Sequence, residues 1–575
     1  MPKETTSMLF PENKGSTNIP LSEYPRPQMV RDSYYSLNGK WDIRISESDA
    51  IVDEFDDEII VPFSPESRLS GAKRAPRPSE FLFYRKKFYL SSDFMKDRLI
   101  INFGAVDFSA DLYVNGHYIG SHRGGYTAFS FDITEWIFIG ENEILLRVSD
   151  PSDTSYHSRG KQKEKRGGIW YTSQSGIWQS VWLESLPSDY ISSLLIVPSL
   201  ERSCVYITVR SASDTECEIV FNGKIHSARS NEPYALYLEN FIAWAPESPM
   251  LYEFSACLGD DRADSYFAMR SFGVGKDSRG IPRLMLNGKP YFHNGLLDQG
   301  YFGYGLYTPE SDEMMISDIT RAKEMGFNML RKHIKIEPMR WYYHCDRLGI
   351  LVWQDMINGG GKYNPLVISS PLITKKHFRD DRYSWFARKD KEGRNEYYAE
   401  LEEMINQLIN VPSIAMWVPF NEGWGQFDAA KALDLILSID KTRTVDHASG
   451  WHDQGIGDIQ SLHVYFTKYR FSPDKKGRVV VLSEFGGYNH KIEGHSFTSR
   501  NFGYKHLKTP EDLKKALTRL YSEEIFPSVE KGLSAAVYTQ LADVEDEVNG
   551  LITHDRAMTK LPTDVIRSIV EYKNK

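Results

Sequence analysis

Residues 411–426 read VPSIAMWVPFNEGWGQ, and the prediction of the fold begins from this stretch. Residues 414–419 are all apolar, a pattern typical of a strand that is buried on both faces in a parallel sheet. The run ends at the polar pair Asn421-Glu422. An ionisable side chain after the carboxyl end of a buried parallel strand lies where barrel enzymes have their active sites.

A second stretch has the same form. Residues 478–487 read RVVVLSEFGG, so another β-rich apolar run leads to one carboxylate, Glu484, and then to glycines. The spacing from Glu422 to Glu484 accommodates about two βα units. Two carboxylates at one barrel mouth indicate glycoside hydrolysis, in which they act in different protonation states.

From residue 273 onward, apolar runs alternate with helical patterns. We expect eight strands, at residues 290–295, 328–332, 350–354, 414–420, 442–447, 460–464, 479–483 and 535–540. We expect helices to begin at Thr308-Pro309 and at the capped start Thr509-Pro510-Glu511-Asp512, with another over the apolar stripe of 401–408. This alternation predicts a (β/α)₈ TIM barrel, with the two glutamates ending strands four and seven.

The residues before the barrel read as β structure. Short strands are separated by turns rich in Gly, Asn and Asp, and Asn115-Gly116 between two such strands is a strong hairpin signal. We therefore expect a jelly-roll, sugar-binding-like sandwich over 1–185 and an immunoglobulin-like β-sandwich over 186–272. The catalytic barrel would occupy 273–575.

Composition excludes several classes of function. The net charge of −9 over 575 residues is mild, and the short basic run 161–166 fits a solvated loop rather than a nucleic-acid surface. Four cysteines without close paired spacing predict no zinc site, and we expect no metal and no cofactor. Residues 1–15 contain no apolar signal segment and no stretch suits a membrane, so we expect a cytoplasmic protein or one whose signal peptide was removed.

Short motifs along the whole chain carry a family resemblance. They are FGAVD at 103–107, VNG at 114–116, GGY at 124–126, FDI at 131–133, GIWQ at 176–179, GFNMLR at 326–331, CDRLG at 345–349, NE at 421–422 and SEFG at 483–486. In this order they resemble family two glycoside hydrolases, the β-galactosidase and β-glucuronidase group. The resemblance implies a jelly-roll sugar-binding domain, an immunoglobulin-like domain and a catalytic barrel.

The resemblance also implies catalytic roles. Glu422 would be the general acid/base and Glu484 the nucleophile of a retaining exo-glycosidase, whose carboxyl groups lie about 5–5.5 Å apart. We expect the ionised Glu484 to raise the pKa of Glu422, so that Glu422 keeps its proton before the attack.

Further residues are candidates for substrate binding. By the family pattern Asn421 would bind the sugar 2-hydroxyl, Arg331 would pair with Glu484, and His463 and Tyr465 would form a His-x-Tyr site in which Tyr465 holds the nucleophile. Position after a strand adds His333, Asp298, Asp355, Trp424, Trp451 and Tyr538. Structural roles compete with these: Arg331 could form a purely structural ion pair, and the aromatic rings, Tyr538 above all, could pack in the core. We expect Trp170-Tyr171-Thr172 to form a surface loop of the first domain.

The glycone is less clear from the sequence. The Asn-x-Lys pair with which β-glucuronidases of this family bind the sugar carboxylate is absent, since Glu547-Val548-Asn549 stands before Gly550. A β-galactoside is therefore the leading expectation, with a β-glucuronide, a β-mannoside or an α-L-arabinofuranoside behind it. A non-catalytic carbohydrate-binding protein is the alternative from another class, disfavoured because both glutamates are present. We expect a glycoside as the only binding partner, apart from possible homo-oligomers, and neither nucleic acid nor membrane.

Overall fold

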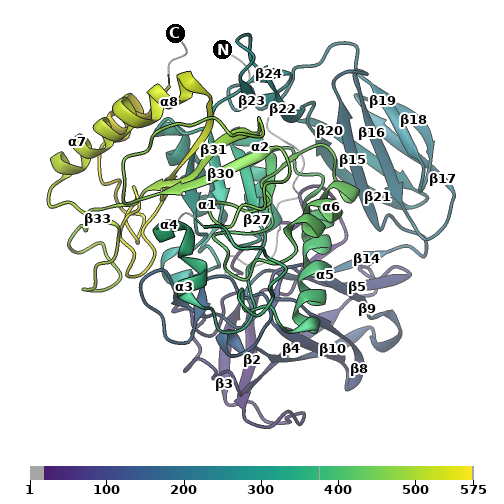
Figure 1. The fold of residues 1–575 in the computed structure, drawn as a ribbon. Coiled ribbons are helices and arrows are strands. Elements are labelled where there is room, and N and C mark those ends of the chain that lie inside the picture. The colour runs from purple at the N-terminus through teal and green to yellow at the C-terminus, as the bar shows by residue number, and fades with distance from the viewer. Residues whose placement is uncertain (1–18, 375, 573–575) are drawn as a thin grey trace.

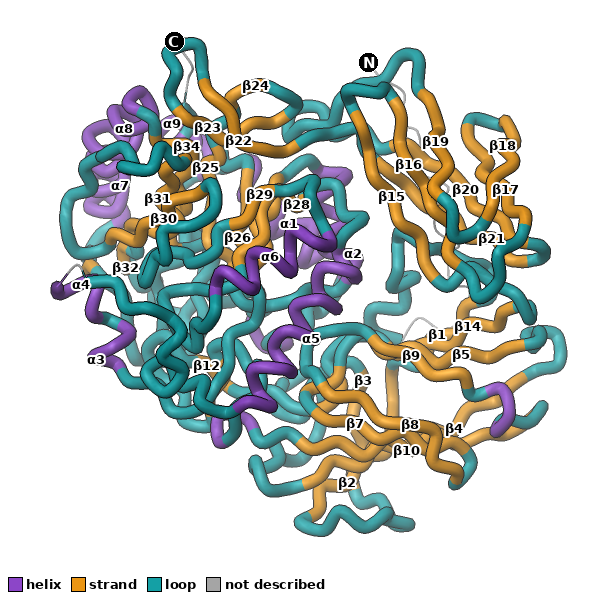
Figure 2. Tube along the Cα trace, turned by 45° about the vertical axis from the view of Figure 1, so that its right-hand side comes forward, coloured by secondary structure: helices purple, strands orange, loops and turns teal. Residues whose placement is uncertain are grey.

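The computed structural model describes residues 19–374 and 376–572. The N-terminal segment on which the localisation expectation rests lies outside these residues. Within them, no helix has the length and apolar character needed to cross a membrane. Two β-sandwiches lie on one side of the molecule and a barrel with its helices lies on the other (Figures 1 and 2).

The first sandwich consists of a six-stranded sheet in the order β3-β2-β4-β10-β7-β8 and a four-stranded sheet in the order β1-β14-β5-β9. Its strands are β1 (Tyr34–Ser36), β2 (Gly39–Ser46), β3 (Asp57–Val61), β4 (Phe81–Leu90), β5 (Arg98–Phe103), β7 (Ser109–Val114), β8 (His117–Arg123), β9 (Phe129–Asp132), β10 (Gly140–Ser149) and β14 (Val181–Leu186). Two short pairs accompany them, β6 (Val106–Asp107) with β13 (Gly176–Ile177), and β11 (Gln162–Lys163) with β12 (Tyr171–Thr172).

The predicted hairpin at Asn115-Gly116 is confirmed. It joins β7 to β8, and both turn residues have positive φ, 49° and 83°. Two consecutive residues of positive φ define the turn that matches the twist of paired strands. Apolar side chains that alternate along β7 and β10 fill the space between the two sheets.

The second sandwich packs a sheet of order β15-β16-β19 on one of order β18-β17-β20-β21. Its strands are β15 (Ser193–Ser199), β16 (Cys204–Arg210), β17 (Glu216–Phe221), β18 (Lys224–Arg229), β19 (Pro233–Tyr237), β20 (Tyr252–Leu258) and β21 (Asp261–Phe267). A small sheet follows, made of β22 (Phe272–Lys276), β23 (Pro282–Leu286) and β24 (Lys289–Pro290).

The barrel is an eight-stranded parallel sheet in the order β29-β28-β27-β26-β25-β34-β31-β30. Its strands are β25 (His293–Asp298), β26 (Met329–Lys332), β27 (Leu351–Asp355), β28 (Ile414–Val418), β29 (Thr444–Val445), β30 (Ile459–Val464), β31 (Val479–Gly486) and β34 (Leu533–Thr539). All eight predicted strands are confirmed, although the first begins three residues later than expected because Lys289–Pro290 forms β24. Within the described residues, β29 and β30 form the two ends of this sheet and are not paired with each other, so the barrel is closed everywhere except between them.

Helices surround this barrel (Figure 2). They are α1 (Asp312–Glu324), α2 (Met339–Leu348), α3 (Pro365–Ile368), α4 (Ser370–Thr374), α5 (Lys391–Leu408), α6 (Ala429–Ile439), α7 (Pro510–Leu520), α8 (Phe526–Lys531) and α9 (Thr563–Val570). The capping box of α7 is confirmed at Thr509 and Asp512. The expected helix start at Thr308-Pro309 is wrong: α1 begins at Asp312, since the Thr308 hydroxyl donates to the Trp178 carbonyl at 2.7 Å.

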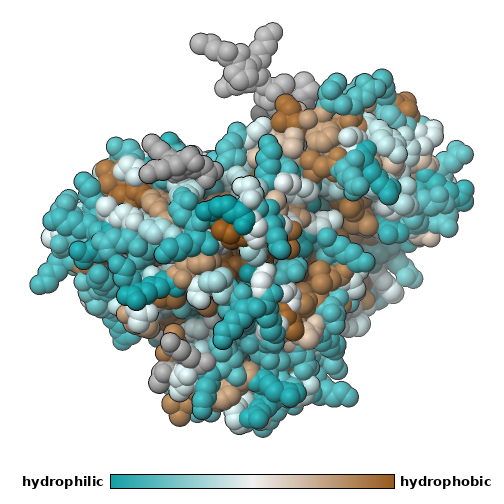
Figure 3. Space-filling model, turned by 45° about the horizontal axis from the view of Figure 1, so that its top comes forward, coloured by the Kyte–Doolittle hydropathy of each residue, from teal (hydrophilic) through white to brown (hydrophobic). Residues whose placement is uncertain are grey.

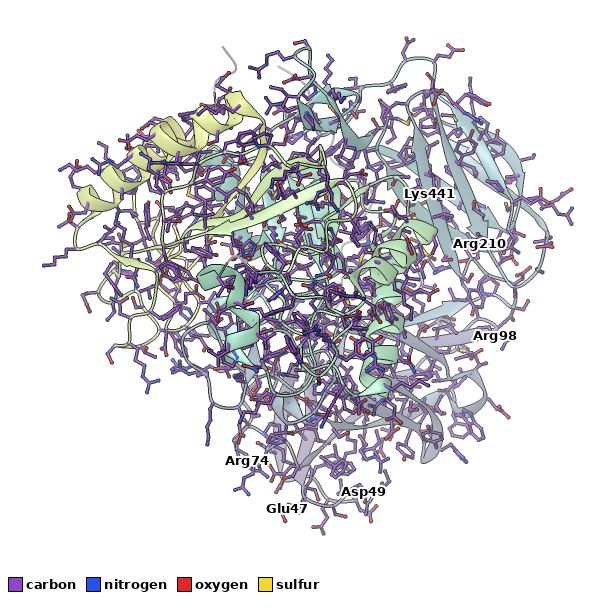
Figure 4. The ribbon with its side chains drawn as sticks, viewed as in Figure 1. Glu47, Asp49, Arg74, Arg98, Arg210 and Lys441 are labelled. Atoms are coloured by element: carbon purple, nitrogen blue, oxygen red, sulfur yellow. The ribbon has the colours of Figure 1, made fainter. Side chains whose placement is uncertain are left out.

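Helix α5 joins the barrel to the first sandwich. Glu396 forms an ion pair with Arg123 at 2.8 Å, and Glu403 accepts a hydrogen bond from Thr127 at 2.8 Å. Glu47, Asp49 and Arg74 lie at the outer end of the first sandwich (Figure 4). Hydrophilic side chains cover most of the face shown in Figure 3, with apolar ones in separate patches.

Candidate active site

The carboxyl ends of β28 and β31 bring the two glutamates together. Carboxylate oxygens of Glu422 and Glu484 and a ring nitrogen of His463 all lie within 4.8 Å of one another. The two glutamates are only 8 % and 4 % exposed, so their carboxylates lie at the bottom of the barrel mouth rather than on its rim. The two carboxylates that follow separate strands therefore lie close together, as we expected.

Local backbone features orient both side chains. Glu422 has a φ of 52°, in the left-handed region that non-glycine residues rarely adopt, and its N–H donates to the Ser449 carbonyl at 2.9 Å. Along β31 the pairing register shifts between Leu482 and Phe485, next to β34. Such an irregularity re-aims the side chains of a strand, and here it contains Glu484.

Two donors hold the Glu484 carboxylate. The Arg331 guanidinium donates to Oε1 at 3.0 Å, and the Tyr465 hydroxyl donates to Oε2. Both contacts were expected from the sequence. Burial lowers the pKa of Arg331, but the charges of Asp355 and Glu484 outweigh it, so the net pKa is raised and the guanidinium stays charged. The guanidinium and the phenol hydroxyl together fix the position of the Glu484 carboxylate.

Glu422 has different partners. Its Oε1 lies 2.7 Å from Nδ1 of His463, and its Oε2 accepts from the Trp424 indole N–H at 3.2 Å. Burial raises the pKa of Glu422, but the hydrogen bond and charge of His463 outweigh burial, so the net pKa is lowered. The expected rise is therefore wrong, because His463, predicted as a substrate-site residue, bonds to this carboxyl group instead.

The remaining polar candidates form a network beneath the glutamates. Arg331 holds Asp355 in a two-pronged contact at 3.0 and 2.9 Å and donates to Asn421 Oδ1 at 2.8 Å. His333 Nδ1 lies 2.7 Å from Asp355 Oδ2. Burial raises the pKa of Asp355 to about 7 despite Arg331. Asp355 thus supports Arg331 and His333 from inside the barrel.

Three of these side chains retain unused hydrogen-bonding atoms. Nε2 of His333, Nδ2 of Asn421 and Nε1 of Trp451 are buried and have no protein partner. Buried polar atoms are normally satisfied, so an unmet donor or acceptor in a cleft indicates a place for water or a polar ligand. All three belong to the set predicted from the sequence to bind substrate.

Two predicted substrate residues lie elsewhere. Asp298 forms a buried ion pair with Lys332 at 2.7 Å and accepts from the Gly300 N–H at 2.9 Å, so both its oxygens are engaged. Tyr538 is 1 % exposed and its ring packs against Phe485 at 5.8 Å, so it offers no face to a sugar. Side chains alternate along a strand, and these two point away from the glutamates' cluster.

A segment of the first sandwich completes the mouth, contrary to the expected surface loop. Trp170 contacts Trp424 with ring centroids 5.3 Å apart, and the Tyr171 hydroxyl donates to the buried Glu547. Burial is the largest effect on both Glu422 and His333: it raises the pKa of Glu422 and lowers that of His333. The charge of Lys161 lowers both pKa values by a smaller amount. Lys161 was not predicted as a site residue because only the fold brings it close to the barrel. The sequence feature that could have indicated it is the apolar run 169–171, which follows the basic run 161–166.

Glu422, His463 and Glu484 also have atom types that ligate metals. Protein groups already occupy their oxygens: Arg331 and Tyr465 on Glu484, and His463 and Trp424 on Glu422. The arrangement suits two carboxyl groups in different protonation states rather than a bare cation.

Comparison with solved structures shows the fold. A Ruminococcus gnavus β-glucuronidase superposes with a TM-score of 0.75 at 17 % identity, covering 96 % of this chain and all of that chain. A family 2 β-galacturonidase from Eisenbergiella tayi gives a TM-score of 0.69 at 19 % identity, covering 94 % of this chain and 98 % of that one.

Curated relatives are more similar in sequence. A β-galactosidase of Thermoanaerobacter pseudethanolicus is 25 % identical over 73 % of this chain and 55 % of its own. A β-glucuronidase of Bacteroides fragilis is 26 % identical over 64 % of this chain and 54 % of its own. The chain thus spans about half the length of these relatives.

Two family models match the sequence. Residues 71–187 match the sugar binding domain of glycosyl hydrolases family 2, and residues 283–487 match the TIM barrel domain of the same family. The second match includes both glutamates, and the two together cover more than half of the residues. The chain belongs to glycoside hydrolase family 2.

Proposed function

We propose that this protein is a retaining exo-glycosidase that hydrolyses a terminal glycosidic bond, with Glu422 as general acid/base and Glu484 as nucleophile. The observation that carries the proposal is the approach of their carboxylate oxygens to within 4.8 Å. Retaining enzymes hold the two carboxyl groups about 5–5.5 Å apart, whereas inverting enzymes need about 6.5–9.5 Å to admit a water molecule.

In the first step, a Glu484 oxygen attacks the anomeric carbon while Glu422 gives its proton to the departing oxygen. The C–O bond to the aglycone breaks as the bond to Glu484 forms. In the second step Glu422 takes a proton from water, the resulting hydroxide attacks the same carbon, and Glu484 leaves as a carboxylate. Arg331 and Tyr465 stabilise that carboxylate before and after the cycle.

The proton for the first step is shared between Glu422 and His463. Their contact of 2.7 Å is a short, charge-assisted hydrogen bond along which a proton can move. As the aglycone oxygen gains negative charge, it becomes the stronger acceptor for that proton.

The sugar would satisfy the unused polar atoms. Nδ2 of Asn421, which is buried and unpaired among the described residues, would donate to the 2-hydroxyl, a contact that strengthens in the transition state. Nε2 of His333 and Nε1 of Trp451 are available to further hydroxyls. Unpaired donors in a buried site favour a ligand rich in hydroxyl groups over an apolar one.

A β-galactoside remains the leading substrate, in line with the β-galactosidases among the relatives. An acidic glycone such as a β-glucuronide is the second candidate, because the Lys161 charge acts on Glu422, His333 and Glu547 together. In such an enzyme Lys161 would take the place of the lysine that is missing from the motif before Gly550. Glu547 itself is paired with Tyr171 and Asn549.

The test is hydrolysis of a panel of nitrophenyl glycosides, with the anomeric form of the first product followed by NMR. We expect one glycone to be cleaved with retention, and the rate to fall at least about 1000-fold in Glu422→Gln and in Glu484→Gln. Glu396→Gln on α5 is the matched control and should keep wild-type activity. Inversion, or activity that survives Glu484→Gln, would refute the mechanism; a folded protein that cleaves no glycoside would favour a binding protein.

A further inference from the structure

A second cluster of ionisable side chains lies in the first sandwich. Asp107 ends β6, Asp150 follows β10, and His157 lies in the segment that leads to β11. Carboxylate oxygens of the two aspartates and a ring nitrogen of His157 lie within 4.8 Å of one another, and all three residues are buried. None of them takes part in the mechanism proposed above.

Much of the hydrogen-bonding capacity of this cluster is unmet, although Asp150 Oδ1 accepts from the Ser152 N–H at 2.7 Å. His157 is 1 % exposed, yet neither of its ring nitrogens has a hydrogen-bond partner within the described part of the chain. Its Nε2 lies 3.6 Å from Asp150 Oδ1, too far for a hydrogen bond. Asp107 Oδ1 and the Ser152 hydroxyl are likewise buried without a partner. By contrast, the other oxygen of Asp107 accepts from Gln162 at 3.2 Å.

The surrounding charge is negative. Besides Asp150, the charged groups that act on Asp107 are Glu66 and Glu400, both carboxyl groups. Among the ion pairs of the described residues, none joins Lys or Arg to Asp107, Asp150, Glu66 or Glu400. Buried carboxylates need a counter-charge or a proton, and among residues 19–374 and 376–572 no Lys or Arg forms an ion pair with Asp107 or Asp150.

We propose that Asp107, Asp150 and His157 bind a divalent transition-metal cation, Mn²⁺ or Zn²⁺. Two carboxylate oxygens and one imidazole nitrogen are a donor set that both ions accept, with bonds of about 2.0–2.2 Å. Atoms around one such ion lie about 3–4 Å apart, so the three side chains close on it by small rotations. The Ser152 hydroxyl and water complete the coordination shell.

The location of the site gives it a structural role in substrate binding. The residues after His157 run along the barrel, where the Arg159 N–H donates to the Asn358 carbonyl at 3.0 Å. Gln162, bonded to Asp107, adjoins Lys161 in the active-site mouth. An ion at this site would therefore hold the segment that carries Lys161 against the barrel, and its loss should raise KM more than it lowers kcat.

The experiment uses the full chain after dialysis against a chelator. Aliquots are equilibrated with Mn²⁺, Zn²⁺ or Mg²⁺, and the bound metal is counted by mass spectrometry while thermal unfolding is followed. We expect one equivalent of Mn²⁺ or Zn²⁺ per chain, an increase in Tm with that metal, and at least a tenfold weaker affinity in Asp107→Asn and in His157→Gln.

The matched control is the double variant Glu422→Gln/Glu484→Gln, which removes the other metal-ligating cluster. It should still bind one equivalent and show the same increase in Tm. The proposal is overturned if wild type binds no metal and its Tm does not respond, in which case the cluster is held neutral by protons. It is also overturned if binding is lost in the double variant, which would locate the ion at the catalytic glutamates. Neither result depends on whether the Asp107 or His157 variants fold.

Discussion

The two proposed catalytic glutamates differ in what surrounds each carboxylate. Arg331 and Tyr465 both donate to Glu484, which suits a group that must stay ionised until it attacks. Glu422 is bonded to His463, which can give or take a proton. Two chemically identical side chains are thus prepared for different roles by their neighbours, as two-carboxylate hydrolysis requires.

One prediction at this scale concerns His463. Its hydrogen bond and charge lower the pKa of Glu422, so His463→Asn should let that pKa rise. An acid of higher pKa stays protonated to higher pH, so the basic limb of the pH profile of kcat/KM should move upward. We also expect kcat to fall about 10–100-fold as the shared proton is lost. Ser449→Ala is the control, because the Ser449 hydroxyl contacts His463 at Nε2 and not at the nitrogen that meets Glu422. An unchanged or lower basic limb in His463→Asn would refute the pairing.

At the scale of elements, the active site is assembled from barrel strands and from one segment of another sandwich. Strands β28, β30 and β31 supply the glutamates and the histidine, whereas residues 158–172 enter from the first sandwich. Trp170 packs there against Tyr363 and Trp424, whose ring centroids lie 6.0 and 5.3 Å from its own. The barrel therefore supplies the reacting groups, and the sandwich segment narrows the mouth.

A prediction for this segment concerns Lys161. If an acidic glycone is accepted, Lys161→Met should lower kcat/KM for a β-glucuronide about 100-fold, the effect of losing a buried charge-assisted contact. For a β-galactoside kcat/KM should change by no more than about threefold, because this sugar has no carboxylate with which Lys161 could pair. The control is Lys163→Met, whose ammonium lies over the Trp170 ring instead. Equal losses on both glycones would show that Lys161 acts on the catalytic groups and not on the sugar carboxylate.

The elements also show what sequence can and cannot predict. The strands ending near Glu422 and Glu484 were predictable because a strand buried on both faces needs an unbroken apolar run. The direction of Asp298 and Tyr538 was not, since it depends on the register of each strand in the barrel. The charge of Lys161 and the bond from His463 to Glu422 depend on segments far apart in sequence. Such tertiary contacts leave no local pattern.

At the scale of the whole molecule, buried polar contacts join the three bodies. Arg31 bonds to Glu184 of the first sandwich at 3.2 Å and to Asp261 of the second at 2.8 Å. The second sandwich reaches the barrel through Tyr266, whose hydroxyl donates to Asp346 of α2 at 2.8 Å. These contacts join the first sandwich to the second and the second to the barrel, so all three bodies are linked through buried polar groups.

The Asp346 contact predicts how stability depends on pH. Burial raises the pKa of Asp346 to about 7, whereas the unfolded chain loses this proton near pH 4. The folded state therefore binds the extra proton between these values, and the free energy of unfolding falls as the pH rises from about 4 to 7.

Asp346→Asn removes this proton linkage. The Tm of the variant relative to wild type should therefore rise between pH 5 and pH 8, corresponding to roughly 2–4 kcal/mol over the full range. Thermal unfolding of both proteins at several pH values measures it, with Asp434→Asn, at an exposed position of α6, as the control. A difference that stays constant with pH would mean that Asp346 is ionised in the folded protein.

Trapping the covalent intermediate tests directly whether Glu484 is the nucleophile. A 2-deoxy-2-fluoro glycoside of the accepted sugar, with a dinitrophenolate leaving group, allows the first step and slows the second, because the fluorine destabilises the positively charged transition state. Intact-protein mass spectrometry followed by peptide mapping should find one sugar per chain, attached to Glu484, and none in Glu484→Gln. A label on Glu422 or on any other residue would mean that Glu484 is not the nucleophile.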